Sequence, residues 1–486
     1  MVDSNFAPRV LFAASEAAPY VKTGGLGDVA GALPAALAAA GAHVALVLPR
    51  YGQIEQAALA GEVHLHDIQV PMPHGNVGCS VSMVPGEVDV YLLGADGLFV
   101  RDEGIYGFDD DLYRFAFFSR AICECMLQVE GFAFDIIHCN DWQTALVPVY
   151  LKSVYARKRA CMQVKTVFTV HNAMFQGKGA EDALYSVLDL GGYPAAASTL
   201  ATDSGSVNLM RGALALADWV TTVSPTYVRE LETAEYGEGL ESAFRRRGES
   251  FSGILNGIDL GAWNPETDEY IAARYSVDDM RGKGACKAEL QEELGLAARA
   301  DVPLIAMVTR LTDQKGVGLV CQALERILEH DVQFAVLGTG DVGYEGTLRA
   351  NAAAHPGKMA AAIRFDNGLS HRIYAGADML LMPSLFEPCG LSQMNAMRYG
   401  TLPVVRETGG LRDSVVPYNK YTGEGTGFSF ANAYADEMAS ILLGACELYA
   451  TDASVWAQLQ SQAMRADFSW TKAAREYLGI YAKIAR

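Results

Sequence analysis

The sequence predicts an α/β fold made of two doubly wound domains. Short, continuous runs rich in Val, Ile and Leu recur along the 486 residues, as in strands buried on both faces of a parallel sheet. Helical patterns lie between these runs, and such alternation is typical of a parallel sheet with helices on both faces. A chain of this length also exceeds one ordinary hydrophobic core, so two domains are expected.

The first half of the chain contains an ordered series of expected strands. These strands are residues 10–14, 44–48, 136–138, 166–170, 219–223 and 251–255. The clearest helix of this half is the Ala- and Leu-rich segment 29–40, which follows the first strand and a glycine turn. We therefore expect residues 1–255 to form the first domain.

A polar, strand-poor stretch beginning at Asn256-Gly257-Ile258-Asp259 separates this half from a second series. Strands are expected there at 305–308, 334–337, 379–382 and 402–405, with helices at 317–329 and 392–399. These patterns place the second domain at 256–466. The remaining segment, 467–486, has a Ser/Thr start signal and an amphipathic pattern. It is expected to pack back on the first domain, with closure of the second as the alternative.

Composition limits the classes of function. The net charge is −19, from 57 acidic and 38 basic side chains, which argues against nucleic acid as a partner because phosphates require a basic surface. No run reaches the roughly 20 apolar residues of a membrane span. The nine cysteines form no paired CxxC framework, and the apolar N-terminal stretch is too short for a signal peptide. We expect a cytoplasmic protein; the sequence leaves its oligomeric state open.

The first motif, Lys22-Thr23-Gly24-Gly25-Leu26-Gly27-Asp28, lies between the first strand and the first helix. Its glycines permit a tight turn that directs backbone amides toward an anion at the helix N-terminus. Lys22 adds a positive charge for a phosphate. The alternative is an ordinary strand–helix turn in which Asp28 caps the helix.

A second motif, residues 309–316, follows the first strand of the second half. Arg310 and Lys315 lie five residues apart across a turn, so both can reach one diphosphate, and Arg can do so in bidentate fashion. The alternative is that both side chains are simply solvated cations in a loop. Because the motif lies at the carboxyl end of a parallel strand, where ligands bind, we favour a ligand-binding role.

The third motif, residues 386–391, also follows a strand. Glu387 can accept hydrogen bonds from sugar hydroxyls, or it can interact with the dipole of the next helix. Gly390, Leu391 and Ser392 offer amides or a hydroxyl to a phosphate. Cys389 is expected to be a packed small residue.

Glycine turns after two further strands extend this pattern. Gly409 and Gly410 follow the strand at 402–405, and residues 338–341 follow the strand at 334–337. Each turn is weak evidence alone. Together they favour a nucleotide-diphosphate site in the second half.

Polar residues also follow two strands of the first half. His171 and Asn172 follow the strand at 166–170, and Asp141 follows the strand at 136–138. We interpret His171 as functional, and Asp141 as either a sugar ligand or a helix cap. The acidic triplet 109–111 is typical of the start of a helix, and we do not interpret it as a metal site. We therefore expect no metal and no cofactor.

Taken together, the motifs resemble the bacterial glycogen synthase and plant starch synthase family over nearly the whole chain. The segments that carry the resemblance are 22–28, 138–142, 169–172, 256–259, 310–316, 370–372, 386–391, 400–403, 408–411 and 468–470. The resemblance implies two Rossmann-like domains facing a deep cleft, the GT-B arrangement of glycosyltransferase family 5. It also implies transfer of glucose from ADP-glucose to an α-1,4-glucan with retention of configuration.

The resemblance assigns roles to these residues. It implies that Lys22 and the Gly24-Gly25 turn contact ADP-glucose, that Arg310 and Lys315 hold the diphosphate and that Glu387 holds the glucose. The donor-side set implied by the family is Lys22, Gly24, Gly25, Asp28, Asn256, Phe365, Gly390, Leu391, Ser392, Gly409 and Gly410. Phe365 would face the adenine, His171 the glucose 6-hydroxyl, and Asp141 and Asn172 the sugars.

Other functions fit the sequence less well. A nicotinamide oxidoreductase would need a well-placed GxGxxG motif with an acidic residue about 20 positions later, and none is evident. A catalytically silent carbohydrate-binding protein would not need Arg310, Lys315 and Glu387 together. A UDP-sugar transferase or a sugar-nucleotide epimerase of the same architecture remains the nearest alternative.

Overall fold

A computed structural model describes residues 7–101 and 103–485, which divide into two compact units. The first unit comprises the chain up to Val223, Val228–Ile254 and the segment from Trp470; the second comprises Ser224–Tyr227 and Leu255–Ser469. The sequence-based boundary lies one residue later than this division. Residues 1–6 and Arg486, which belong to the predicted segments, lie outside the described residues.

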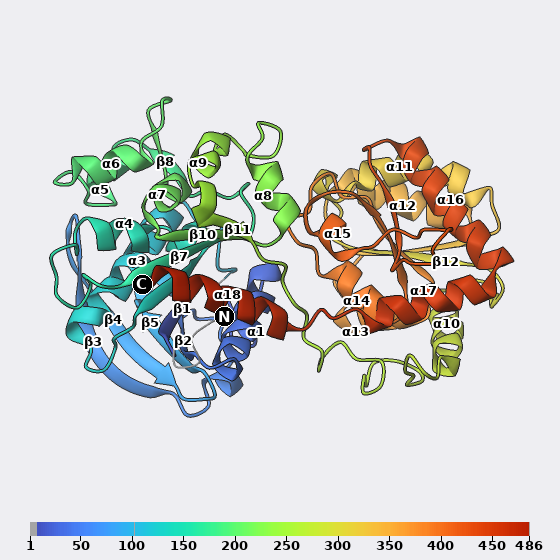
Figure 1. The fold of residues 1–486 in the computed structure, drawn as a ribbon, viewed down its shortest axis with the longest axis horizontal. Coiled ribbons are helices and arrows are strands. Elements are labelled where there is room, and N and C mark those ends of the chain that lie inside the picture. The colour runs from blue at the N-terminus through green and yellow to red at the C-terminus, as the bar shows by residue number, and fades with distance from the viewer. Residues whose placement is uncertain (1–6, 102, 486) are drawn as a thin grey trace. The chain divides into compact units, whose positions relative to one another are not determined.

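The sheet of the first unit runs β11-β10-β7-β6-β1-β2-β5-β4-β3 among the described residues (Figure 1). Its strands are β1 (Arg9–Ala13), β2 (His43–Pro49), β3 (Val63–Met72), β4 (Gly75–Val84), β5 (Asp89–Gly94), β6 (Ile136–Asn140), β7 (Lys165–Val170), β10 (Trp219–Thr222) and β11 (Phe251–Gly253). A separate antiparallel pair consists of β8 (Lys178–Ala180) and β9 (Ser206–Asn208).

The order of the parallel strands fixes where this unit can bind a ligand. The chain extends the sheet in one direction from β1 through β2 to β5, and in the other from β6 through β7, β10 and β11. The direction reverses between β1 and β6, which pair in parallel register. Ligands of open α/β sheets bind at the carboxyl ends of the strands beside such a reversal. The loops after β1 and β6 are therefore the candidate loops.

The edge strand β3 and its neighbour β4 differ from the predicted all-parallel sheet. They form an antiparallel hairpin, and β4 also pairs antiparallel with β5. Five of the first six residues of β3 are exposed, and buried residues alternate with exposed ones further along it. Our interpretation relied on continuous apolar runs, so it missed strands of this half-exposed type.

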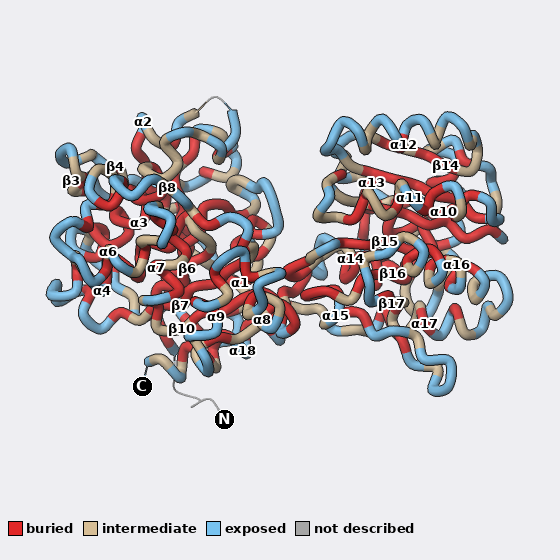
Figure 2. Tube along the Cα trace, turned by 90° about the horizontal axis from the view of Figure 1, so that it is seen from above, coloured by how far each residue is buried: buried red, intermediate tan, exposed pale blue. Residues whose placement is uncertain are grey.

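Helices pack around the sheet of the first unit. Their bounds are α1 (Gly25–Ala39), α2 (Asp96–Phe99), α3 (Asp111–Gln128), α4 (Leu146–Lys152), α5 (Ala183–Ser186), α6 (Pro194–Leu200), α7 (Leu209–Leu216), α9 (Glu241–Arg245) and α18 (Trp470–Ile484). Helix α8 (Pro225–Leu231) begins in the second unit and continues into the first from Val228. Figure 2 shows the central strands as largely buried, with exposed residues concentrated on the outer helices and loops.

The C-terminal helix α18 packs against α1, as Figure 1 also shows. Its aromatic residues reach the strands: the Tyr481 hydroxyl lies 2.7 Å from Nδ1 of buried His138, whose Nε2 lies 2.6 Å from Thr169 Oγ1. Tyr477 also contacts the His138 ring. His138 is thus a core residue, and α18 supplies part of the core of the first unit.

The second unit has an all-parallel sheet in the order β14-β13-β12-β15-β16-β17. Numbered from its first strand, this is the order 3-2-1-4-5-6 of dinucleotide-binding folds, with the reversal between β12 and β15. The bounds are β12 (Leu304–Val308), β13 (Gln333–Leu337), β14 (Met359–Ala362), β15 (Met379–Met382), β16 (Leu402–Arg406) and β17 (Phe428–Phe430).

Eight helices accompany this sheet within the described residues. They are α10 (Arg281–Glu293), α11 (Val317–Leu328), α12 (Val342–Ala354), α13 (Asn367–Gly376), α14 (Ser392–Arg398), α15 (Gly409–Ser414), α16 (Ala435–Thr451) and α17 (Ala453–Arg465). The predicted helix 317–329 corresponds to α11, whose buried residues Val317, Val320, Leu324 and Ile327 recur at helical spacing.

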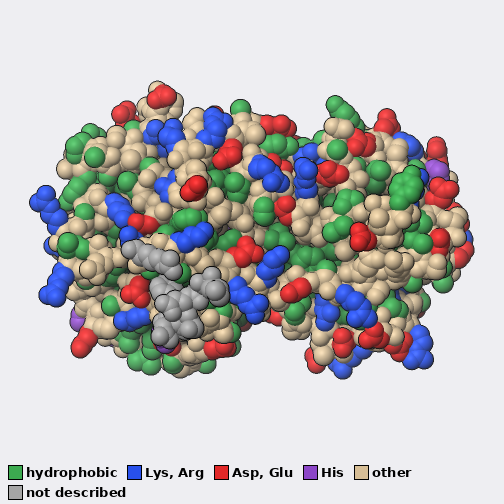
Figure 3. Space-filling view, in the orientation of Figure 1, with side chains coloured by type: hydrophobic (Ala, Val, Ile, Leu, Met, Phe, Trp, Pro, Cys, Tyr) green, Lys and Arg blue, Asp and Glu red, His purple; other side chains and the backbone are tan. Residues whose placement is uncertain are grey.

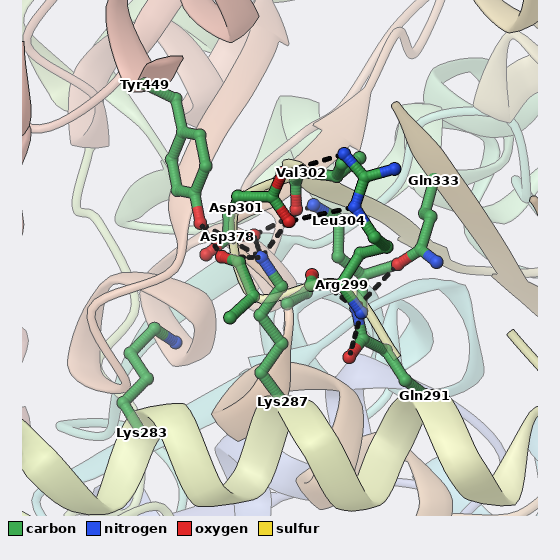
Figure 4. A network of polar contacts seen from close by, with 12 residues as sticks. Lys283, Lys287, Gln291, Arg299, Asp301, Val302, Leu304, Gln333, Asp378 and Tyr449 are labelled. Atoms are coloured by element: carbon green, nitrogen blue, oxygen red, sulfur yellow. Dashed lines mark hydrogen bonds and ion pairs between the residues drawn. The ribbon is translucent and has the colours of Figure 1, made fainter. Parts of the chain in front are cut away.

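Helix α10 is held to the sheet by buried charge (Figure 4). Lys287 forms an ion pair of 2.7 Å with Asp378, which precedes β15, and it also donates to the Val302 carbonyl at 2.6 Å. Asp378 accepts the Leu304 amide of β12 at 2.8 Å. Because both charges are paired and hydrogen-bonded, they are tolerated in the interior.

Figure 3 shows Lys and Arg side chains interspersed with Asp and Glu on the visible face of both units. None of the helices formed by residues 7–101 and 103–485 combines the length and the apolar character that crossing a membrane requires. All nine cysteines are free thiols.

Candidate functional site

The motif at 22–28 forms the end of the loop before α1 and the first turn of that helix, with Gly24 in an extended conformation at the helix N-cap. Lys22 is half exposed, and its ammonium contacts Asp28 Oδ1 at 2.6 Å. Gly27 leaves no room for a side chain, because a Cβ there would lie 2.8 Å from Lys22 Cγ. The loop therefore presents a half-exposed Lys22 ammonium group, and its counterion, Asp28, belongs to the same motif.

Buried Glu16, which sequence reasoning missed, organises this loop. Its carboxylate accepts the Thr23 amide at 2.5 Å and the Thr23 hydroxyl at 2.7 Å, and it faces the amides of Gly24 and Gly27. Burial raises the pKa of Glu16, against the lowering effect of these donors. Part of the predicted anion site is thus occupied by a side chain of the protein itself.

Asp141 and His171 meet at the carboxyl ends of β6 and β7. Asp141 has a positive φ of 56°, unusual for a non-glycine residue, and its Oδ1 accepts the His171 amide at 2.7 Å. Burial raises the pKa of Asp141 to about 7, opposed by the amides of His171 and Asn172. The carboxyl group is therefore poised to change charge near neutral pH.

The protonation of His171 follows from its neighbour Asn140. The Asn140 amide group donates to the carbonyls of Ala13 and His138 at 3.0 and 3.3 Å, so its Oδ1 is left as the acceptor 2.9 Å from His171 Nε2. Burial lowers the pKa of His171 to about 3. At neutral pH the ring is uncharged, with the proton on Nε2 and Nδ1 as a hydrogen-bond acceptor.

In the second unit, Lys315 and Glu387 lie after β12 and β15, the two strands beside the reversal. Lys315 Nζ is 2.5 Å from Glu387 Oε2, which also accepts the Ser384 hydroxyl at 3.1 Å. The Glu387 side chain is 7% exposed and that of Lys315 is 17% exposed. The tertiary structure thus joins two separate motifs, 72 residues apart, into one charged cluster.

Two glycines allow these loops to approach one another. Gly316 has φ 68°, and a Cβ there would lie 2.0 Å from the Pro383 carbonyl oxygen. Gly409 has φ 42°, and a Cβ there would lie 2.0 Å from the Glu387 carbonyl oxygen. Only glycine fits both the conformation and the space. The Gly410 amide donates to the same carbonyl at 3.1 Å.

Arg310 and Arg406 differ in how far their side chains are engaged. Arg310 is exposed, and its side chain forms no hydrogen bond or ion pair with the described part of the chain, so the guanidinium group is available to an anionic ligand. Arg406, which the sequence reading did not select, is buried and donates to the Ser384 carbonyl at 2.9 Å and to that of Leu385. It holds the loop that carries Glu387.

The remaining donor-side residues of the third motif cluster around Cys389. Gly390 has φ 72°, and Leu391 is the N-cap of α14, whose first residue is Ser392. The backbone amide of Asn256 faces the Cys389 thiol, whose pKa burial raises to about 12. Cys389 is therefore a packed, unreactive thiol, as expected.

Phe365 lies outside these clusters, and Asn172 joins them only through its backbone amide, which faces Asp141. Phe365 is 90% exposed between β14 and α13. The Asn172 side chain accepts the Met174 amide at 3.0 Å, which stabilises its own turn. Neither side chain shows a contact that assigns it to a site.

The acidic triplet 109–111 begins α3 as predicted. Asp110 pairs with Arg101 at 2.5 Å, and Asp111 pairs with Arg114 and accepts the Gly107 amide at 2.8 Å. Within residues 7–101 and 103–485, no cluster of His, Cys, Asp and Glu is suited to a metal ion.

Two protein-family models match most of the chain. The starch synthase catalytic domain matches residues 9–246, and the model of group 1 glycosyl transferases matches residues 293–450. The chain belongs to the starch and glycogen synthase family. The family resemblance inferred from the motifs is therefore confirmed.

Members of the family from bacteria are similar over the full length. The chain is 45% identical to a glycogen synthase of Exiguobacterium sibiricum over 480 residues, covering 98% of this chain and 99% of that protein. It is 44% identical to a glycogen synthase of Bacillus anthracis, with the same shares covered.

Solved structures agree with the fold. The catalytic domain of starch synthase IV from Arabidopsis thaliana, bound to ADP and acarbose, superposes with a TM-score of 0.90 at 36% identity, covering 99% of this chain and all of that one. A sucrose-phosphate synthase from Thermosynechococcus elongatus reaches 0.60 at 18% identity, covering 98% and 99%, which supports the fold alone. The predicted two-domain α/β fold of the GT-B class is confirmed, and the oxidoreductase and epimerase alternatives are not favoured.

Proposed function

We propose that the protein is a glycogen synthase that transfers glucose from ADP-glucose to the non-reducing end of an α-1,4-glucan, with retention of configuration. The observation that carries the proposal is the cluster of Lys315, Glu387 and Ser384 beside an unengaged Arg310 at the strand reversal of the second unit. Full-length similarity to glycogen synthases supports the same reaction.

The diphosphate is the part of the donor that these residues recognise best. Arg310 and Lys315 supply two positive charges after β12, and guanidinium groups bind phosphate oxygens in bidentate fashion. When the bond between glucose and phosphate breaks, negative charge grows on the leaving diphosphate. Cations placed before the reaction stabilise that charge without reorganisation.

Glu387 and His171 are proposed to contact the glucose. Glu387 is held by Lys315 and Ser384 and keeps a second oxygen for a sugar hydroxyl. Neutral His171 offers Nδ1 as an acceptor for a hydroxyl hydrogen. His171 belongs to the first unit and Glu387 to the second.

Retention is proposed to proceed by attack of the acceptor on the face from which the diphosphate leaves. The carboxylate of Glu387 is neutralised by Lys315 at 2.5 Å, which makes it a weak nucleophile for a covalent glucosyl intermediate. The departing diphosphate can instead accept the proton of the attacking glucan hydroxyl.

ADP is the proposed nucleotide, since the similar starch synthase IV structure carries ADP. We propose that no metal is required, because Arg310 and Lys315 neutralise the leaving group. Activity should persist in excess chelator, and its loss with recovery on adding Mg²⁺ would contradict this point. The nine free thiols favour a reducing compartment such as the cytoplasm.

The direct test measures transfer of radiolabelled glucose onto glycogen from ADP-glucose and from UDP-glucose. We expect incorporation from ADP-glucose to exceed that from UDP-glucose by at least about tenfold, which corresponds to about 1.4 kcal/mol of discrimination. Incorporation from neither donor would overturn the proposed function. Preference for UDP-glucose would overturn the nucleotide assignment alone.

A further inference from the structure

A cavity lies in the first unit, away from the loops described above. It is a cavity of about 340 Å³ whose lining includes Ser198, Thr199, Arg211, Leu214, Arg246 and Arg247. These residues come from α6, α7 and the end of α9. Three arginines around one cavity stand out in a chain with a net charge of −19.

The cavity lies at the end of the sheet opposite to the candidate loops. Arg247 donates to the carbonyls of Ala217 and Asp218 at 2.9 and 3.3 Å, and these residues immediately precede β10. Arg247 itself lies four residues before β11. Lys22, Asp141 and His171 follow the carboxyl ends of parallel strands, whereas this cavity adjoins their amino ends.

None of the three guanidinium groups forms an ion pair with a carboxylate of the described residues. The Arg246 side chain has no hydrogen bond or ion pair with them, and the residue is exposed. Arg211 uses only Nη1, which donates to the carbonyls of Ser198 and Thr199 at 3.2 and 3.0 Å and to that of Ala201. Nε and Nη2 of Arg211 thus remain available.

Arg247 is the most constrained of the three. Its Nη atoms donate to backbone carbonyls, while its Nε is buried without a partner. Burial lowers the pKa of Arg247, and Asp218 is the acidic neighbour that opposes this effect. Asp218 is itself engaged by Lys152 at 3.0 Å and by Thr166. An anion in the cavity would supply the missing negative charge.

We propose that this cavity binds a small phosphate ester, with the phosphate held by the guanidinium groups of Arg211 and Arg246. Arginine side chains with free N–H groups match phosphate oxygens in geometry and charge. The volume lies at the lower end of the range for small organic ligands, and Leu214 with two alanines adds an apolar wall for the organic part. The ligand class is therefore a phosphorylated small molecule and not a neutral sugar.

The test uses isothermal titration calorimetry on the full chain in the presence of saturating ADP, so that a phosphate-binding donor site is filled. Fructose 6-phosphate is the probe, with fructose and inorganic phosphate as comparisons. We expect fructose 6-phosphate to bind, fructose not to bind, and inorganic phosphate to bind more weakly than the ester.

The matched variants are Arg246→Ala and Arg245→Ala, adjacent exposed arginines of which only the first lines the cavity. R246A should weaken binding at least about tenfold, because a charge-assisted hydrogen bond is worth about 1.5–3 kcal/mol. R245A should bind as the parent does. Absence of binding by the parent, or equal losses in both variants, would overturn the site. Inorganic phosphate binding as tightly as the ester would overturn the ester assignment.

Discussion

At the scale of single residues, the candidate site contains charged side chains that form ion pairs within the protein and one that does not. Lys315 is paired with Glu387 at 2.5 Å, whereas the Arg310 side chain has no partner among the described residues. A ligand phosphate therefore gains most from Arg310, because no existing ion pair has to be broken. This difference leads to the first prediction.

Replacing Arg310 by Ala should lower kcat by about 10²–10³, the usual cost of removing one electrostatic stabiliser of a transition state. Arg310→Lys should fall between this variant and the parent, since it keeps the charge and loses the bidentate geometry. Arg349→Ala is the matched control, because Arg349 is an exposed arginine of α12 whose ion-pair partner is Glu345 of the same helix. Near-parental glucose transfer by R310A would contradict the assignment.

Asp141 should make stability depend on pH. Its pKa is raised from 3.8 to about 7 in the folded protein, so the folded state binds more protons than the unfolded state between these values. The stability linked to Asp141 is thus present below about pH 4 and lost as the pH rises through 7. Asp141→Asn cannot ionise and should exceed the parent in unfolding free energy at pH 8 by about 1–3 kcal/mol.

Urea unfolding at pH 5 and pH 8 measures this effect. The advantage of D141N should shrink at pH 5, while Asp203→Asn, at an exposed position, should stay within about 0.5 kcal/mol of the parent at both values. An equal difference between D141N and the parent at the two pH values would show that Asp141 does not titrate in this range.

At the scale of elements, helices are attached by buried polar groups as well as by apolar packing. Lys283 of α10 donates to the carbonyls of Ala375 and Tyr399 at 3.0 Å, at the C-terminal ends of α13 and α14. Burial lowers the pKa of Lys283 to about 8. Lys287, one turn later, is instead paired with Asp378, so it contributes the more critical contact.

Replacing Lys287 by Met should destabilise the second unit by about 3–5 kcal/mol, because Asp378 would remain buried without a counterion. Adding Asp378→Asn should recover part of this loss. Arg281→Met on the same helix removes a cation that is 90% exposed and should change the unfolding free energy by no more than about 0.5 kcal/mol. Thermal and urea unfolding provide the comparison; equal stability of K287M and R281M would refute the role of the ion pair.

At the scale of the whole molecule, both units share one plan. In each, the chain starts at a central strand, builds the sheet outward in one direction and then returns to build the other side. The reversal falls between β1 and β6 in the first unit and between β12 and β15 in the second. All the charged candidates follow these central strands or the strand beside them.

Because each unit has its own core, the second unit should fold alone. We expect the fragment Leu255–Ser469 to bind ADP within about tenfold of the full chain but to transfer no glucose. Calorimetry with ADP and the transfer assay measure both properties, and the fragment carrying Arg310→Ala serves as the control that should not bind. A cooperatively folded fragment without affinity for ADP would place the nucleotide elsewhere.

The residues in the site were predictable to different degrees. Lys22, Arg310, Lys315 and Glu387 were selected because charged residues and glycines follow apolar runs in the sequence. Glu16, Asn140 and Arg406 were missed, since each acts by contacts with residues distant in the chain. The antiparallel strands β3 and β4 were missed for a related reason: their half-exposed pattern has no continuous apolar run.

The sequence by itself determined the fold class, the family and most charged residues of the site, because hydrophobic periodicity and glycine turns are local signals. Only the tertiary structure decided which loops are neighbours. The 72 residues between Lys315 and Glu387 give no indication of a 2.5 Å contact; the strand order that places β12 beside β15 creates it. Strand order depends on non-local pairing across the sheet, and for the same reason the arginine-lined cavity of α6, α7 and α9 was visible only in the folded chain.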